Sequence, residues 1–143
     1  MSIWFKEYSL HDLNDLRGVQ KENINKHLGI KITEIGDDYL KGSMPVDERS
    51  KQPFGILHGG ASCVLAESLG SIAGWMCIDP DKFMAVGLEI HAHHLRPLTG
   101  GYVTGICKPV RIGKTIHLWN IDMSGDDGKM NCTCRLSVAV KAR

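Results

Sequence analysis

A single carboxylate, Glu67, lies in the segment from Lys51 to Gly74, KQPFGILHGGASCVLAESLGSIAG, in which most other residues are apolar or small. No basic residue occurs between His58 and Lys82, so a local ion pair does not explain it. A carboxylate that is partly removed from water suits attack on a carbonyl carbon or activation of a water molecule. We therefore expect Glu67 to be a nucleophile or general base, although most helical glutamates simply face solvent.

The start of the same segment can polarise a carbonyl group. Gly59 stands where a helix is expected to begin, and the first amides of a helix lack partners within it, so one can donate to an oxygen that gains negative charge. Gly60 follows, and two successive glycines let the backbone approach a substrate closely. A tight loop-to-helix turn would also explain the pair, and both interpretations can hold. His58 and Gln52 flank this corner.

A long helix must position these groups. It is expected to start near His58 or Gly59 and to stop before Asp79, which gives close to five turns at ~3.6 residues each. Small residues recur three or four positions apart and predict a narrow stripe with Glu67 at its middle. These residues are Cys63, Gly70, Ser71 and Gly74. The bulky residues on the other stripes are expected to pack into a curled sheet: Val64, Leu65, Leu69, Ile72, Trp75 and Met76.

The remaining sequence predicts strands and one further helix. Ser9 and Asp12 resemble a capping pair, and leucines at helical spacing predict a helix through about Lys26. Residues 29–36 and 38–46 predict a β-hairpin. Four more β-rich runs joined by short turns favour an antiparallel meander: 84–95, 101–110, 114–123 and 129–140. The total is an α+β fold with about six strands around one long helix.

Composition restricts the class of protein. A chain of 143 residues without repeats or low-complexity tracts fits one domain, residues 1–143. A net charge of +1 gives no overall field for nucleic acid or anionic membrane. The start MSIWFKEYSL lacks the features of a secretory signal, and no run of ~18 apolar residues occurs, so a soluble, cytoplasmic protein without nucleic-acid or membrane partners is expected. The five scattered cysteines predict reduced core thiols.

The segment QPFGILHGGASCVLAESLGSIAG resembles the active-site segment of the PaaI-type hotdog acyl-CoA thioesterases, and the resemblance extends through MPVDERSKQPFG, VGLEIHAHHLRP and CKPVRIGKT. It is most similar to the aroyl-CoA branch, which includes the 1,4-dihydroxy-2-naphthoyl-CoA thioesterases of menaquinone synthesis. The resemblance implies a hotdog fold and hydrolysis of acyl-CoA thioesters with Glu67 as nucleophile or general base. It implies that His58 and Gln52 orient substrate, water or departing thiolate. It also implies that Ser71 contacts substrate or supports the site, the alternative being a hydrogen bond back to a helix carbonyl.

The resemblance also implies where the nucleotide phosphates of CoA bind. His94 and Arg96 match the family's basic strand end. The RIGKT turn offers the amides, ammonium and hydroxyl of Gly113, Lys114 and Thr115 to the same phosphates. The alternative interpretation of each of these residues is that it belongs to an ordinary solvated turn. CoA is part of the substrate, so no cofactor is expected.

The motifs HAHH and CTC could suggest a metal site. His91 and His93 share one face of a predicted strand, and Cys132 and Cys134 share one face of another. The spacing differs from common zinc-binding pairs, and no second matching pair is evident. No metal is therefore expected.

Two other functions fit part of this pattern. Hotdog dehydratases and hydratases combine a histidine with a helix carboxylate, but the resemblance implies a different offset there, whereas HGG here precedes Glu67 by nine positions and favours hydrolysis. A non-catalytic acyl-CoA-binding module, in which Glu67 only sets specificity, is the other alternative. Detection of released CoA separates hydrolysis from both.

A second chain is expected to complete the site. The acyl ring would lie along the small-residue stripe, with Gly70 and Gly74 giving it width, but such small side chains cannot close a pocket alone. Edge-to-edge pairing of two sheets would continue the sheet and bring Glu67 of one chain opposite the QPFG loop of the other. We therefore expect a homodimer with shared sites, which the resemblance extends to a tetramer.

Overall fold

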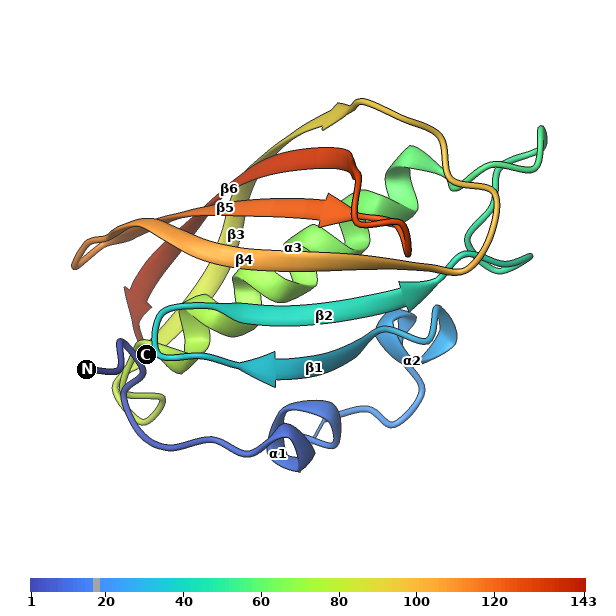
Figure 1. The fold of residues 1–143 in the computed structure, drawn as a ribbon. Coiled ribbons are helices and arrows are strands. Elements are labelled where there is room, and N and C mark those ends of the chain that lie inside the picture. Colours follow the sequence, from blue (N-terminus) through green and yellow to red (C-terminus); the bar gives the residue numbers. More distant parts are fainter. Residues whose placement is uncertain (17–18) are drawn as a thin grey trace.

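The structure, a computed structural model, describes residues 1–16 and 19–143. One six-stranded antiparallel sheet curls around a long helix, α3 (Gly59–Met76) (Figure 1). The strands are β1 (Lys31–Ile35), β2 (Leu40–Pro45), β3 (Phe83–His94), β4 (Tyr102–Ile112), β5 (Ile116–Ser124) and β6 (Met130–Ala142). Their spatial order is β1-β2-β4-β5-β6-β3, which places β3 at one edge and β1 at the other. The predicted hotdog architecture is confirmed.

Helix α3 lies within its predicted bounds. His58 is the N-cap residue, with an extended backbone and an Nδ1 that accepts a hydrogen bond from the Gly60 amide at 2.8 Å. Cys77 is the C-cap residue. An imidazole cap of this kind satisfies one of the amides that a helix leaves without an internal partner at its start. None of the helices among residues 1–16 and 19–143 is long and apolar enough to span a membrane.

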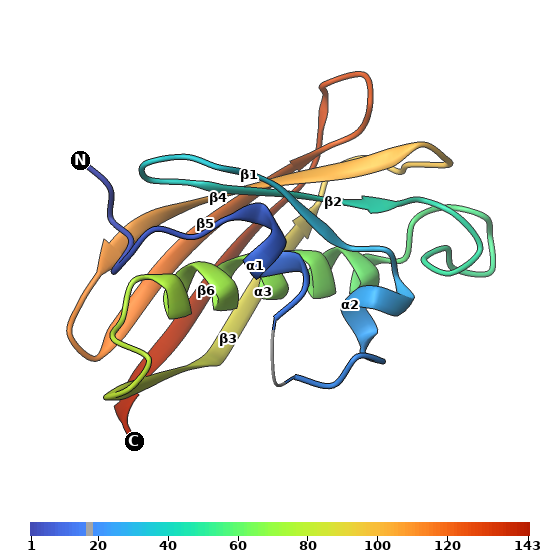
Figure 2. The ribbon, with the colours of Figure 1, turned by 90° about the horizontal axis from the view of Figure 1, so that it is seen from below.

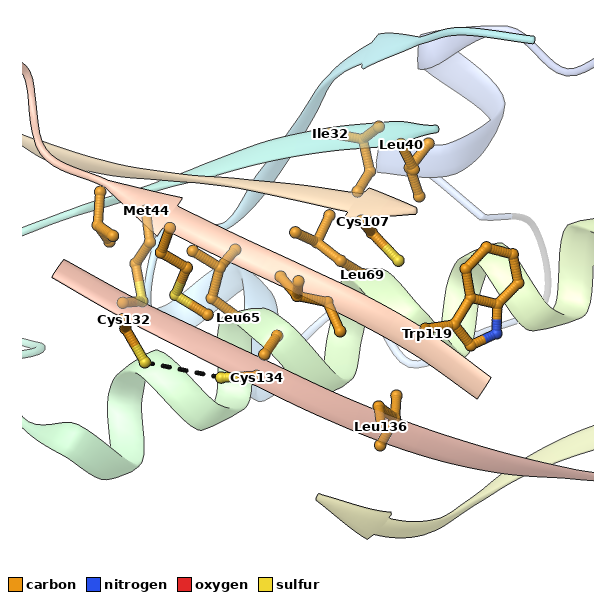
Figure 3. Close-up of a cluster of buried hydrophobic side chains, with 14 of the residues drawn as sticks. Ile32, Leu40, Met44, Leu65, Leu69, Cys107, Trp119, Cys132, Cys134 and Leu136 are labelled. Carbon is orange, nitrogen blue, oxygen red and sulfur yellow. Dashed lines mark hydrogen bonds between the residues drawn. The ribbon is translucent and has the colours of Figure 1, made fainter. Parts of the chain in front are cut away.

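The core fills the space between α3 and the concave face of the sheet (Figure 3). Leu65 and Leu69 of α3 and Trp119 and Ile121 of β5 are fully buried. A buried side chain of this size contributes about 1.5–3 kcal/mol relative to an exposed one. Every second residue of β5 is buried, so this strand has one face in the core and the other on the outside.

The prediction that Gly70 and Gly74 widen an acyl pocket is wrong, because both glycines are buried against β6. A Cβ on Gly70 would lie 2.4 Å from Cδ2 of Leu136, and one on Gly74 would lie 3.3 Å from Cγ1 of Val138. These positions are glycine because helix and sheet approach closely there. The members of the predicted stripe that keep some exposure are Cys63, Glu67 and Ser71.

The predicted helix through Lys26 is wrong in length. The structure has two short helices instead, α1 (Leu10–Asn14) and α2 (Ile24–His27), and part of the predicted span, Arg17 and Gly18, lies outside the described residues. The predicted capping pair at the start of α1 is present. Figure 2 shows α1 and α2 on the side of α3 that the sheet leaves uncovered.

The two edges of the sheet differ. At β1, the side chain of Asn14 makes the two backbone hydrogen bonds that a neighbouring strand would make. Its Nδ2 donates to the Ile32 carbonyl at 2.9 Å, and its Oδ1 accepts from the Ile32 amide at 2.8 Å. Edge strand β3 has no such partner among the described residues and carries exposed apolar side chains. These are Phe83, Met84, Val86 and Leu88, 38–57% exposed. A long apolar edge of this kind is a template for pairing with another chain.

Candidate active site

The first turn of α3 leaves one backbone amide available. The Gly60 amide donates to His58 Nδ1, and the amides of Ala61 and Ser62 donate to the His58 carbonyl at 3.0 and 3.2 Å. Within the described residues, the Gly59 amide has no acceptor. It can therefore donate to a substrate oxygen at the positive end of the helix dipole, as its sequence position predicts.

His58 has a defined tautomer as a result of this capping. Because Nδ1 accepts from Gly60, the proton of a neutral ring lies on Nε2. The side chain is exposed, so Nε2–H can reach a bound molecule beside Gly59. His58 thus presents a hydrogen-bond donor at the corner where the sequence placed it.

The loop carrying Gln52 folds back on itself. The Gln52 amide donates to the Ile56 carbonyl at 2.8 Å, and its carbonyl accepts from Gly55 at 2.9 Å. The side-chain oxygen of Gln52 accepts from the Phe54 amide. Its carboxamide nitrogen has no partner in the part of the chain that the structure describes, so it is the end of Gln52 left to contact a ligand.

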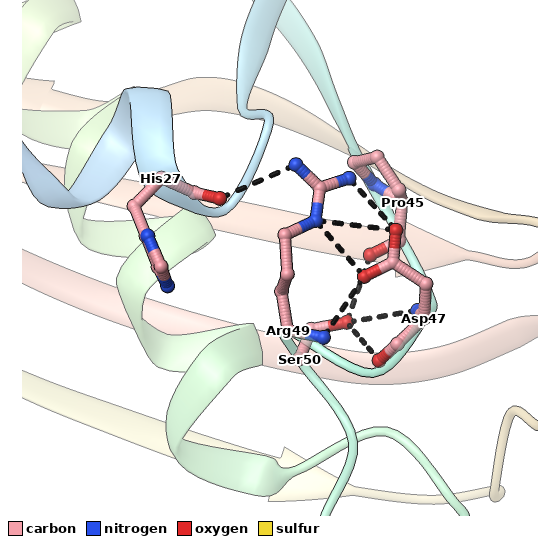
Figure 4. A network of polar contacts seen from close by, with 5 residues as sticks. All are labelled: His27, Pro45, Asp47, Arg49 and Ser50. Atoms are coloured by element: carbon pink, nitrogen blue, oxygen red, sulfur yellow. Dashed lines mark hydrogen bonds and ion pairs between the residues drawn. The ribbon is translucent and has the colours of Figure 1, made fainter.

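A polar network holds this loop against β2 and α2 (Figure 4). Arg49 binds the Asp47 carboxylate through Nη2 at 2.7 Å and donates from Nη1 to the His27 carbonyl at 3.3 Å. The guanidinium holds the pKa of the Asp47 carboxyl below its usual value. Ser50 donates its hydroxyl proton to the last carbonyl of β2 at 2.8 Å, and its own carbonyl accepts from the His58 amide at 2.8 Å. The network thereby fixes the backbone on which His58 is mounted.

His94 lies at the same corner. Its Nε2 is 2.9 Å from the position that a Cβ on Gly59 would occupy, so the ring packs directly on the first residue of α3. Its Nδ1 lies 3.6 Å from Sγ of Cys132, its partner across the β3–β6 ladder. The sequence associated His94 with the phosphates of CoA, whereas this contact with Gly59 was not predicted. The available signal was that His94 alternates with His93 and so faces the opposite side of the strand.

Glu67 occupies the middle of α3 and points toward β3. Its Oε1 is 2.7 Å from the position of a Cβ on Gly87, so only glycine there leaves the carboxylate undisturbed. Gly87 borders a β-bulge, where the register shifts between Gly87 and Glu89. The carboxylate is exposed in the single chain. The expected removal of the Glu67 carboxylate from water therefore requires a covering group from outside this chain.

One chain does not bring Glu67 and Gly59 together. Their positions are eight residues apart, which corresponds to about 12 Å along the helix axis. The carboxylate must come within about 3.5 Å of a carbonyl carbon and the amide within about 3 Å of its oxygen, so the two groups must lie within roughly 8 Å. Glu67 also lies beside Gly87, which is about 23 Å along β3 from His94 at ~3.3 Å per residue. Within one chain, the Glu67 carboxylate and the corner at Gly59 therefore lie apart from each other.

Ser71 lies one turn beyond Glu67 and is partly buried. Its hydroxyl makes no hydrogen bond within the described residues, and the alternative interpretation, a bond back to a helix carbonyl, is not observed there. The neighbouring Ser68 does have a partner, Asn25 Oδ1 at 2.8 Å. Ser71 Oγ therefore remains available to a ligand near the carboxylate.

The residues expected to bind CoA phosphates lie in two groups, at opposite ends of the folded chain. Arg96 lies near the His94 end, where it donates to Asp127 Oδ1 at 2.8 Å and to the Lys129 carbonyl at 3.2 Å. These contacts hold the guanidinium close to the turn between β5 and β6. Its charge is already paired with the Asp127 carboxylate, whose pKa lies below its usual value through bonds to the Lys129 amide and Arg96.

The RIGKT turn joins β4 to β5 beside the C-terminal end of α3 (Figure 1). Gly113 donates to the Ile116 carbonyl at 3.0 Å, and the Thr115 carbonyl accepts from the Val140 amide at 2.8 Å. Lys114 is exposed. Helix α3 has 18 residues and spans about 27 Å. This turn and the corner at Gly59 therefore lie at opposite ends of the folded chain.

The histidine and cysteine pairs lie on opposite faces of the sheet. His91 and His93 pair in the ladder with Arg135 and Thr133 on the outer face, while Cys132 and Cys134 are buried on the inner face. No group of three histidine, cysteine, aspartate or glutamate side chains among residues 1–16 and 19–143 is arranged to hold a metal ion. His91 and His93 therefore do not meet the cysteine pair, and of the HAHH motif only His94 contacts Cys132.

A polarising amide at a helix start, neighbouring imidazoles and an isolated carboxylate on a hotdog fold are the parts of a thioester hydrolase. The profile of the thioesterase superfamily matches residues 54–132, more than half of the chain. The chain belongs to the thioesterase superfamily.

Individual relatives cover nearly the whole chain. It is 44% identical over 138 residues, 96% of this chain and 98% of the relative, to the 1,4-dihydroxy-2-naphthoyl-CoA hydrolase of Escherichia coli. A mutant thioesterase of Pseudomonas aeruginosa superposes with a TM-score of 0.94 at 46% identity, covering 99% of this chain and 100% of that one. A thioesterase of Haemophilus influenzae gives 0.92 at 41% identity, covering 98% and 95%. The protein is thus an enzyme of a thioesterase family.

Proposed function

We propose that the protein hydrolyses acyl-CoA thioesters to a free acid and CoA, with aromatic acyl groups preferred. The observation that carries this proposal is that, within the described residues, each chain holds a free Gly59 amide at a helix start and an isolated Glu67 carboxylate far from it. The preference for an aromatic acyl group, of the 1,4-dihydroxy-2-naphthoyl or hydroxybenzoyl type, is supported by the name of the Escherichia coli relative at 44% identity.

In the proposed mechanism, the thioester carbonyl lies at the α3 N-terminus with its oxygen on the Gly59 amide. That amide is fixed before the reaction, so it stabilises developing negative charge without reorganising. Glu67 either attacks the carbonyl carbon, which expels the CoA thiolate and leaves an anhydride that water hydrolyses, or takes a proton from a water molecule that attacks the carbonyl and expels the thiolate directly. His58 Nε2–H and the Gln52 carboxamide donate to the substrate or the departing thiolate, and Ser71 Oγ lies one turn from the carboxylate.

We infer that each site is built from two chains paired along β3. The β1 edge is covered by Asn14, whereas β3 is open and apolar. A two-fold axis that places Glu67 of one chain over Gly59 of the other crosses both helices midway, near Cys63. The same axis then brings Gly87 of one chain near His94 of the other, and the midpoint of these two positions lies between Ile90 and His91, in the C-terminal half of β3. The pairing of the helices and the pairing of the β3 strands therefore have one compatible register.

The same pairing brings the ends of the chains together. With α3 helices antiparallel, the RIGKT turn of one chain approaches the corner of the other that holds His94 and Arg96. Lys114 of one chain and Arg96 of the other then lie on the same side of the site, where phosphate groups of CoA can bind. We propose that such dimers associate further into a tetramer of single-domain chains, as the family resemblance implies.

Thiol release from purified protein tests the reaction. We expect hydrolysis of 1,4-dihydroxy-2-naphthoyl-CoA and hydroxybenzoyl-CoA to be faster than that of medium-chain acyl-CoAs. Glu67→Gln should lower kcat at least ~10²-fold, because it removes the nucleophile or base. Glu22→Gln is the matched control, since Glu22 is an exposed carboxylate that pairs with Lys26 and lies outside β3. Retention of wild-type kcat by Glu67→Gln, or no CoA release from any substrate, would contradict the proposal.

A further inference from the structure

Two buried cysteine thiols form a chain of contacts that begins at His94. Cys132 Sγ lies 3.6 Å from His94 Nδ1 and also 3.6 Å from Cys134 Sγ, the contact drawn in Figure 3. Both cysteines are at most 2% exposed. We propose that Cys132 is a positioning residue, whose thiol holds the His94 imidazole with Nε2 protonated and directed at the start of α3, where it donates a hydrogen bond to the substrate. This inference rests on the proposed function.

Counting donors assigns the direction of these hydrogen bonds. Cys132 and Cys134 each have one S–H, and the imidazole Nδ1 is a better acceptor than a thiol sulfur. If Cys134 donates to Cys132 and Cys132 donates to Nδ1, both thiol protons have acceptors. If Nδ1 carried the proton and donated to Cys132, one buried S–H would be left unpaired. The first arrangement is favoured because it leaves no buried donor without a partner.

The electrostatics of the thiols agree with this direction. The hydrogen bond with Cys132, together with burial, raises the pKa of the Cys134 thiol, so this thiol keeps its proton and is able to donate it. The same bond lowers the pKa of Cys132. An S–H donor of lower pKa forms the stronger hydrogen bond to an imidazole nitrogen. Cys134 thus supports Cys132 in the same way that Cys132 supports His94.

The position of the ring determines what Nε2–H can contact. Among the ring atoms, Nε2 comes nearest to the place of a Cβ on Gly59, at 2.9 Å, with Cε1 at 3.1 Å and Cδ2 at 3.3 Å. The tip of the imidazole therefore points at the corner. With the assigned tautomers, this corner offers three N–H donors, from the Gly59 amide, His58 and His94. A cluster of donors suits the thioester oxygen and sulfur, on which negative charge increases as the C–S bond breaks.

The alternative is that Cys132 only fills space in the core. Cys107 provides the comparison, because it is fully buried on β4 and its thiol makes no side-chain hydrogen bond among the described residues. Burial raises the pKa of its thiol. Replacing either cysteine by valine keeps similar volume, but only at Cys132 does it remove a donor to a histidine. Cys107→Val is therefore the matched control for packing effects.

Nitrogen-15 NMR of the wild-type enzyme tests the tautomer directly. The shifts of the two His94 ring nitrogens, assigned by their loss in His94→Gln, are expected to show a protonated Nε2 and an unprotonated Nδ1 at neutral pH. In Cys132→Val the two shifts should move toward a mixture of tautomers, and Cys132→Ser should restore them. A wild-type ring protonated on Nδ1 would overturn the proposal. This readout does not depend on turnover, so it stands even if Glu67 has no role.

Kinetics test whether the positioning matters. Cys132→Val is expected to lower kcat about 2- to 10-fold, the effect of losing one hydrogen bond, with inhibition by free CoA unchanged. Cys132→Ser, which keeps an O–H donor, should recover most of this loss, and Cys107→Val should match the wild type. Equal kcat in Cys132→Val and wild type, or equal losses in Cys132→Val and Cys107→Val, would show that the thiol only packs.

Discussion

Substituting Gly87 by alanine should displace the Glu67 carboxylate without removing it. The added Cβ would lie 2.7 Å from Glu67 Oε1, whereas an ordinary contact begins at about 3.4 Å, so the carboxylate must move by roughly 0.7 Å or more. Because Oε1 is the far end of a flexible side chain, the clash is relieved at little cost in folding free energy. Alanine also suits a strand better than glycine. A shift approaching 1 Å at the reacting group costs up to ~10²-fold in rate.

We therefore expect Gly87→Ala to lower kcat about 10- to 100-fold while the melting temperature stays the same or rises slightly. Thiol release at saturating acyl-CoA and thermal denaturation measure the two quantities. Gly100→Ala is the matched control, because a Cβ at Gly100 meets nothing within 4 Å. Wild-type kcat in Gly87→Ala would refute the position assigned to Glu67, and a large fall in melting temperature would show that the glycine serves folding instead.

Three further substitutions test other parts of the structure. Gly70→Ala should lower the free energy of unfolding by about 1–3 kcal/mol in urea titrations and leave kcat of the folded enzyme unchanged, since the new Cβ meets Leu136 and not the substrate. Lys114→Ala should raise KM for CoA thioesters but not for a truncated pantetheine thioester, and equal losses on both would misplace the phosphates. Burial holds the pKa of His117 below its ordinary value, so its unfolded form gains a proton first as pH falls through ~6.5 and stability is lost there. The melting temperature should then fall less in His117→Gln than in the wild type between about pH 7 and pH 5, and equal falls would exclude this residue as a cause.

The sequence predicted the elements whose signals are local. The bounds of α3 follow from the cap at His58 and the change of composition before Asp79, and both were confirmed. The corner at Gly59 could be predicted because a helix start always leaves amides free. The hotdog arrangement followed from one long helix among strands with short turns. In these cases the residues that carry the signal are neighbours in the chain.

Features that depend on packing between distant segments were not predictable in the same way. Gly70 and Gly74 look like Cys63 and Ser71 on a helical wheel, and only contact with β6 distinguishes them. His94 was assigned to phosphates from the family resemblance, and its alternation with His93 shows only that the two side chains face opposite sides of β3, not which side is concave. The bulge after Gly87 also breaks the alternation of β3, so the face of its first half does not predict that of the second.

The N-terminal segment shows a different limit. Leucines at helical spacing predicted one helix through Lys26, yet the described residues of this span form only two short helices, at the capping pair of α1 and the cap of α2. Asn14 ends α1 by turning its side chain to the backbone of β1. That tertiary contact outweighs the helix propensity of the residues beyond it, which is a weak preference.

The central claim is that Glu67 of one chain acts on a thioester held at Gly59 of another, and mixing two inactive variants tests it most directly. Glu67→Ala and Gln52→Ala are unfolded and refolded together in equal amounts, and subunit exchange is verified by mass. In a shared-site dimer, each mixed pair has one site with both residues intact. Random pairing should therefore restore about a quarter of wild-type thiol release. A mixture that has exchanged subunits and remains as inactive as the separate variants would contradict the account.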